Sequence, residues 1–169
     1  MTFYKTQRLV VRQWERSDAG ALHGIMSDSR VHTYTGDTAW TKGRTKEYIQ
    51  QMLGYDFKTL ELFHGACVLK ATGQFIGLTG LNPYLPLQPE LEWQLGAAFW
   101  GSGYATELGR ATIANAFGTT GITAIYGMAN PENKASMRAL EKIGMHCLGL
   151  RAFRGHQDIF YKIDRNDLL

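Results

Sequence analysis

The alternation of apolar and polar positions predicts a chain in which strands and helices follow one another. Short runs rich in β-branched and aromatic residues predict strands, whereas apolar residues three or four positions apart predict helices that bury one face. Polar residues dominate 28–39, and 82–89 holds three of the four prolines, so we expect loops there. In chain order the expected elements are a strand at 8–14, helices at 19–26 and 41–53, strands at 66–70, 74–78 and 90–99, a helix at 104–117, a strand at 123–129, a helix at 134–143, and strands at 147–151 and 158–163.

This order of elements predicts one α/β domain, residues 1–169, built around a mixed sheet. The sequence shows neither an internal repeat nor a linker that would divide it. Capping residues support the helix boundaries: Ser17 and Asp18 precede the first helix, Asn133 precedes the last, and Gly144 follows it.

The charge balance and the rare residue types narrow the class of protein. Lys and Arg total 18 against 15 Asp and Glu, a net charge of +3 without a basic cluster, so no nucleic-acid partner is expected. The longest near-apolar stretch, 95–100, is far shorter than the roughly 20 residues of a membrane span, and the first residues lack the apolar core of a signal peptide. Cys67 and Cys147 form no Cys-x-x-Cys pair and the five histidines lack zinc spacing, so we expect a cytoplasmic protein with reduced thiols and no metal.

Most chemical information lies in the strand, glycine turn and helix at 90–117. Glycines let a backbone approach a ligand, and the first amides of a helix attract an anion. A P-loop would need a lysine where Ser102 stands, and a dinucleotide fingerprint would need a glycine where Thr106 stands. The pyrophosphate of coenzyme A and a plain tight turn remain as interpretations.

A resemblance in the residues of this turn favours the coenzyme A interpretation over a plain tight turn. Trp100-Gly101-Ser102-Gly103-Tyr104-Ala105-Thr106-Glu107 resembles the acyl-CoA pyrophosphate loop of the GNAT N-acetyltransferase superfamily, Gln/Arg-x-x-Gly-x-Gly/Ala. Gly103 and Ala105 match its last two positions, whereas Trp100 departs from the first, as in the branch resembling ribosomal-protein N-terminal acetyltransferases (RimJ/RimL-like). A second block at 130–145 and shorter matches near both ends extend the resemblance over almost the whole chain. It implies a GNAT-like α/β (α+β) fold, with a mostly antiparallel twisted sheet flanked by helices, and acetyl-CoA as cosubstrate.

The resemblance also implies which residues hold acetyl-CoA. Backbone amides of the turn would hold the pyrophosphate, the strand before it would pair with the pantetheine arm, and Asn133 would bond that arm besides capping its helix. The cofactor-binding residues expected in this way are Gln94, Leu95, Gly96, Ala97, Trp100, Gly101, Ser102, Gly103, Tyr104, Ala105, Thr106, Asn130, Asn133 and Ser136.

Two side chains are candidates for the chemistry of acyl transfer to an amine, which needs a base, an oxyanion donor and an acid for the leaving thiolate. Glu92 is the candidate base, since the resemblance implies an acid at this point of the strand that approaches the thioester. It shares a strand face with Glu90 and Gln94, and a solvated polar face is the alternative. Ser136 is the candidate acid, placed beside the CoA sulfur by the resemblance; a hydrogen bond back to the preceding helix turn is the alternative. The oxyanion donor is expected to be a backbone amide near Leu95 or Gly96.

The function predicted from these features is an acetyl-CoA-dependent N-acetyltransferase acting by direct attack in a ternary complex. The expected acceptor is the α-amine at a protein or peptide N-terminus; a small-molecule amine, or a CoA-binding regulatory module without catalysis, are the alternatives. Two loops, 28–39 and 82–89, are expected to line the acceptor groove. Four aromatic residues are expected either to line it or to belong to the core: Tyr34, Trp40, Tyr84 and Trp93. The oligomeric state stays open, with a homodimer as one option.

Overall fold

An eight-stranded sheet with strand order β1-β2-β3-β4-β5-β6-β8-β7 forms the centre of the computed structural model. The structure describes residues 1–55, 64–85, 88–153 and 155–168. The strands are β1 (Thr2–Lys5), β2 (Leu9–Arg12), β3 (His64–Leu69), β4 (Phe75–Leu85), β5 (Gln88–Leu95), β6 (Ala124–Ala129), β7 (His146–Phe153) and β8 (His156–Asp164). The helices are α1 (Asp18–Met26), α2 (Lys42–Gly54), α3 (Tyr104–Thr119) and α4 (Lys134–Ile143), with short 3-10 turns η1 (Ser29–His32), η2 (Ala97–Phe99) and η3 (Arg165–Leu168).

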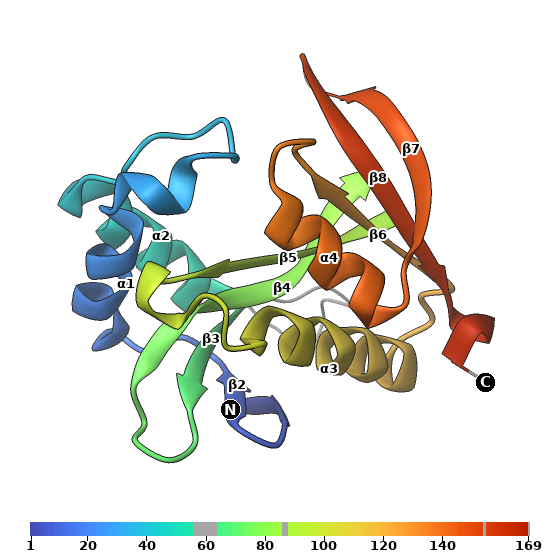
Figure 1. The fold of residues 1–169 in the computed structure, drawn as a ribbon. Helices are drawn as coiled ribbons and strands as arrows, with labels where there is room; N and C mark the ends of the chain where they lie inside the picture. The colour runs from blue at the N-terminus through green and yellow to red at the C-terminus, as the bar shows by residue number, and fades with distance from the viewer. Residues whose placement is uncertain (56–63, 86–87, 154, 169) are drawn as a thin grey trace.

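Helices cover both faces of this sheet (Figure 1). Leu22 of α1 and Ile49 of α2 pack on one face, against Ala66 and Leu78. On the other face, α3 and α4 lie side by side over a core that includes Leu91, Ile113, Leu140 and Tyr161. Among the helices of the described residues, none is long and apolar enough to cross a membrane.

The sheet changes character between β5 and β6. Every other neighbouring pair is antiparallel, whereas β5 and β6 run parallel. Within the described residues their pairing is limited to Glu90 opposite Tyr126. Beyond that point the two strands part, and the remainder of β5 lacks the partner that a continuous ladder would supply.

Local signals explain most helix boundaries. The Thr41 side chain accepts a hydrogen bond from the Arg44 amide at the start of α2, and Asn133 Oδ1 accepts one from the Ser136 amide at the start of α4. Gly144 ends α4 in the left-handed conformation, with φ 108°. Ser17 is an exception, because its side chain makes no capping hydrogen bond; instead Asp18 accepts from the Glu15 amide and pairs with Arg12.

Several expected elements differ from those observed. The expected loop at 82–89 was wrong, since β4 continues to Leu85 and β5 begins at Gln88, with Pro83 opposite Pro89. Pro89 is tolerated because it lies outside the described pairing of β5 with β6, so no bond to β6 is lost at this position. The expected strand at 90–99 ends at Leu95 and continues as η2, and the short strand β1 carried too little pattern to be predicted.

Candidate active site

The parting of β5 and β6 opens a cavity of about 330 Å³. Because the strands diverge beyond Glu90, groups from both faces of the sheet reach the same space. Its lining comes from β5, from the end of β6, from α4, and from the loop after η1: Tyr34, Thr35, Glu90, Leu91, Glu92, Trp93, Gln94, Met128, Ala129, Asn130, Asn133, Ser136 and Asp158. Five of the residues predicted from the sequence, Glu92, Gln94, Asn130, Asn133 and Ser136, therefore meet around one cavity.

The glycine turn lies past the end of β5, at the start of α3. Gly101 and Gly103 have φ values of 74° and 79°, a left-handed conformation that favours glycine. Gly103 precedes α3 without a capping side chain, so the first amides of this 16-residue helix are available to a ligand. The predicted residues at 95–97 and 100–106 are thus continuous with the cavity along the chain, but they are not among its lining residues.

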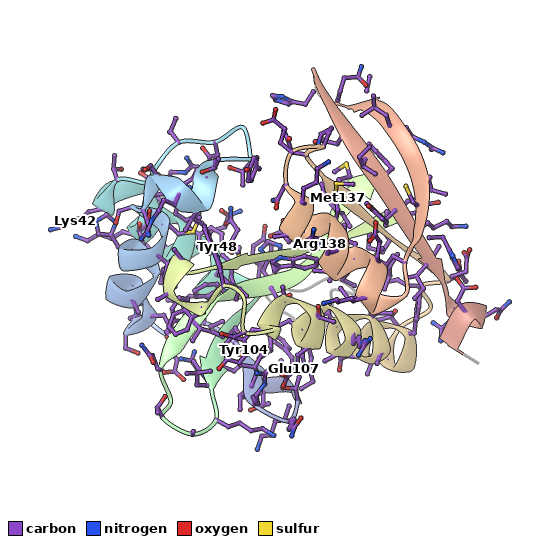
Figure 2. The ribbon with its side chains drawn as sticks, in the orientation of Figure 1. Lys42, Tyr48, Tyr104, Glu107, Met137 and Arg138 are labelled. Carbon is purple, nitrogen blue, oxygen red and sulfur yellow. The ribbon has the colours of Figure 1, made fainter. Side chains whose placement is uncertain are left out.

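A group of polar contacts ties this turn to the start of β2. Arg8 donates to the Ser102 carbonyl at 2.9 Å and to Glu107 Oε2 at 2.7 Å, and its guanidinium lies 4.4 Å from the centre of the Tyr104 ring. The carboxylate of Glu107 also accepts from the Thr6 hydroxyl. Burial opposes ionisation, but these hydrogen bonds hold the pKa of Glu107 below its ordinary value. Figure 2 shows Tyr104 and Glu107 together at this end of α3.

The first turn of α4 contributes the opposite wall of the cavity. The Asn133 Oδ1 atom is used in capping, which leaves its NH₂ group as a donor. Asn130 Oδ1 accepts from the Glu132 amide and so fixes the turn before the helix. In the part of the chain that the structure describes, the Ser136 hydroxyl has no hydrogen-bond partner, so the back-bond considered from sequence is not formed and the hydroxyl is available to a ligand.

Glu92 approaches the cavity from the opposite face of the sheet. Its neighbour on that face, Gln94, pairs with Leu78, which packs against α1 and α2. Glu92 Oε1 lies 2.7 Å from His64 Nε2, and Glu92 Oε2 accepts a hydrogen bond from Asn82. The carboxylate is therefore held by two side chains and remains 29% exposed, which contradicts the simple solvated face considered from sequence.

The backbone at the end of β5 narrows the choice of oxyanion donor. The Gly96 amide donates to the Ile76 carbonyl at 3.0 Å, so it is not free. Consecutive strand amides point to opposite edges, and the Leu95 amide therefore faces the edge that β6 has left. Of the two amides expected from sequence, Leu95 is therefore the one that points away from β4.

These features identify the family once they are compared with known proteins. A family model described as "Acetyltransferase (GNAT) domain" matches residues 8–146. The chain belongs to the GNAT acetyltransferase family. It is accordingly an acyltransferase, and coenzyme A is the ligand that this fold binds.

Individual proteins are similar to this chain over most of its length. The Bacillus subtilis protein YkkB is 31% identical over 150 residues, covering 83% of each chain. A crystal structure of a GNAT acetyltransferase from Bacillus anthracis is 25% identical, covers 98% of this chain and 99% of its own, and superposes with a TM-score of 0.86.

More distant GNAT structures share the fold alone. Ribosomal-protein-S5-alanine acetyltransferase from Vibrio fischeri is 17% identical with a TM-score of 0.80, over 99% of this chain and 98% of its own. Aminoglycoside acetyltransferase AAC(6')-Ib, solved with coenzyme A, is 19% identical with a TM-score of 0.79, over 95% of this chain and 96% of its own.

Of the aromatic residues expected to line the acceptor groove, some line the cavity and one belongs to the core. Tyr34 and Trp93 line the cavity. Trp40 is instead buried among the residues that pack under α1 and α2, and the side chain of Tyr84 lies outside the described part of the structure.

Sequence reasoning gave no role to two polar side chains at this site, His64 and Asp158, and it placed Asn82 in the groove only as part of the loop 82–89. Asp158 lines the cavity, and the other two contact Glu92. Neither His64 nor Asp158 belongs to a motif. Only the strand register, in which His64 lies opposite Gly80 and Gly80 opposite Glu92, could have revealed His64.

Proposed function

We propose that this protein is an acetyl-CoA-dependent N-acetyltransferase of the RimJ/RimL-like branch that acetylates the α-amine at a protein or peptide N-terminus. One observation carries the proposal. The cavity where β5 and β6 part is lined by a carboxylate from one face of the sheet, Glu92, and by a hydroxyl from a helix on the other face, Ser136. A base and an acid that approach one space from opposite sides suit direct transfer between two substrates.

The donor side of the proposal uses the turn and α4. The amides of Ser102 to Ala105 would hold the pyrophosphate of acetyl-CoA, helped by the dipole of α3. The unpaired edge of β5 at Gln94 to Ala97 would take the pantetheine arm, and the NH₂ group of Asn133 would donate to it. Arg8 neutralises Glu107, the one acidic residue in the first turn of α3, which would otherwise repel a phosphate.

The proposed reaction is R–NH₂ + acetyl-S-CoA → R–NH–acetyl + CoA-SH. The C–N bond forms as the C–S bond breaks, so the amine loses a proton and the thiolate gains one. Glu92 would take the proton from the amine, and the Leu95 amide would donate to the carbonyl oxygen as negative charge develops there. Ser136 would hydrogen-bond the leaving thiolate, directly or through water, because a serine hydroxyl is a weak acid.

Proton equilibria favour an α-amine as acceptor. An α-amine has a pKa of about 7.7–8.0 against about 10.4 for lysine, so at pH 7 its neutral fraction is several hundred times larger. A site with a single carboxylate as base suits the easier deprotonation. The S5-alanine acetyltransferase shares this fold and supports the assignment.

A small-molecule amine is the second candidate, because the charged residues that line the cavity, Glu90, Glu92 and Asp158, are all acidic and would attract a cationic compound. The fold shared with AAC(6')-Ib is consistent with that alternative. For location we propose the cytoplasm, where Cys67 and Cys147 would remain reduced; both are free thiols here.

A competition experiment tests the acceptor. Peptides with a free N-terminus and no lysine are mixed with N-blocked peptides that carry lysine, and acetylated sites are mapped by mass spectrometry in the presence of acetyl-CoA. We expect acetylation of α-amines. Preferential modification of lysine would refute the preference, and turnover confined to small amines would transfer the assignment to the second candidate.

A further inference from the structure

We propose that Tyr48 and His64 act as a positioning pair behind Glu92, with the Tyr48 hydroxyl selecting the tautomer of His64 and His64 holding the Glu92 carboxylate toward the cavity. The inference rests on the proposed role of Glu92 as base. His64 does not line the cavity, so its action on the acceptor is indirect.

The sheet brings these residues together across three strands. His64 on β3 lies opposite Gly80 on β4, and Gly80 lies opposite Glu92 on β5. Neighbouring strands are about 4.8 Å apart, so the backbones of His64 and Glu92 are separated by about 10 Å. Directly opposed residues share a face, and the intervening residue has no side chain. Because Gly80 has no side chain, the imidazole of His64 can reach across it to the carboxylate of Glu92.

The short contact fixes where one proton lies. His64 Nε2 is buried and lies 2.7 Å from Glu92 Oε1, an ion-pair contact without hydrogen-bond geometry in this structure. Two lone pairs would repel at that distance, so a hydrogen on Nε2 is the arrangement that relieves the contact. His64 Nδ1 lies 3.1 Å from the Tyr48 hydroxyl. In the neutral imidazole Nδ1 is then an acceptor, and the phenol donates to it.

The surroundings keep the phenol protonated and in place. Burial raises the pKa of Tyr48 above its ordinary value, and the negative charge of Glu92 raises it further. The Tyr48 ring packs edge-on against Trp14 and at a tilt against Trp40, with centroids 5.4 and 5.2 Å away. Trp14 also donates its indole N–H to the His64 carbonyl at 2.9 Å, which fixes the start of β3. Figure 2 shows Tyr48 between α2 and the sheet.

Further contacts restrain the same glutamate. Asn82 donates to its second oxygen, and the buried Thr79 hydroxyl donates to its backbone carbonyl at 2.9 Å. A carboxylate has about four lone-pair sites, so the two side-chain donors leave others for the acceptor amine. The pair formed by Tyr48 and His64 thus fixes the orientation of Glu92 without consuming its capacity to accept a proton.

Kinetics of three variants test the pair. His64→Ala should lower kcat by about 10- to 100-fold, by analogy with the loss of a residue that orients a metal-ligating side chain, while the Kd of acetyl-CoA stays within twofold. His64→Gln should recover most of the loss, since its amide can donate to Glu92 and accept from Tyr48. Tyr48→Phe keeps the ring packing and removes only the hydroxyl, and it should lower kcat by several-fold. His23→Gln and Tyr161→Phe, which change the same residue types away from Glu92, should retain wild-type kcat.

Nuclear magnetic resonance of the imidazole nitrogens tests the arrangement in the protein without acceptor. We expect the Nε2–H tautomer for His64 in the wild type and its partial loss in Tyr48→Phe. A predominant Nδ1–H tautomer, or His64→Ala with wild-type kcat, would overturn the inference. Wild-type protein that acetylates no amine would instead refute the proposed function, and the tautomer would still decide the arrangement.

Discussion

At the scale of single residues, Glu92 carries the most specific expectation. Glu92→Gln retains shape and hydrogen bonding but cannot take a proton, so turnover should fall by about 10²–10⁴-fold with little change in the Kd of acetyl-CoA. Steady-state rates and calorimetry measure the two quantities. Glu132→Gln, an exposed glutamate in the turn before α4, is the control. Unchanged turnover in Glu92→Gln at pH 7 would assign the base to another group or to water.

Gly103 offers a second test at this scale. A valine there would obstruct the approach of the pyrophosphate to the amides of α3, so the Kd of CoA should rise at least tenfold. The left-handed φ of 79° also costs the variant about 1–2 kcal/mol of folding stability.

Gly73→Val separates the two effects of this substitution. Gly73 has a similar φ of 70°, and a side chain there meets nothing within 4 Å. It lies in the turn between β3 and β4, so this variant should lose similar stability and bind CoA normally. If folded Gly103→Val and Gly73→Val bound CoA with equal affinity, the glycine turn at 101–103 would have a structural role and no role in CoA binding.

At the scale of elements, the start of α4 combines a structural and a proposed binding role in Asn133. Asn133→Ala should cost about 0.5–2 kcal/mol of unfolding free energy, because the Ser136 amide loses its cap. Asn133→Asp retains a capping oxygen but lacks the NH₂ donor. We therefore expect Asn133→Asp to unfold at the same denaturant concentration as wild type and to bind acetyl-CoA more weakly. Wild-type affinity in Asn133→Asp would leave Asn133 with the capping role alone.

The elements also show how far sequence reasoning reaches. Helices α2, α3 and α4 were predicted within two residues because caps and apolar stripes are local signals. The strands at Pro83 and Pro89 were missed because pairing across the sheet outweighs local propensity. Likewise Glu92 and Ser136 could be proposed from motifs, whereas His64 could not, because it reaches Glu92 only through the register of three strands.

At the scale of the whole molecule, acetyl-CoA should stabilise the folded protein by binding where β5 and β6 part. A concentration of 100 times Kd adds about 2.7 kcal/mol to the free energy of unfolding. For a chain of this size that corresponds to a rise in Tm of about 5–11 °C. A thermal-shift titration measures it, with ATP as the control ligand. No response to acetyl-CoA or CoA would refute the proposed function.

The parting of β5 and β6 has a consequence for solubility. It gives the sheet two strand edges in its interior, in addition to those at β1 and β7. Open edges pair with other chains and promote aggregation, so proteins usually cover or charge them. The interior edges face the cavity between β5, the end of β6, α4 and the loop after η1, and these elements hinder the approach of a foreign strand with its side chains. The narrow, extended pantetheine arm of acetyl-CoA could still enter the cavity. We expect the protein to keep backbone hydrogen-bonding groups available for a ligand without making them available for self-association.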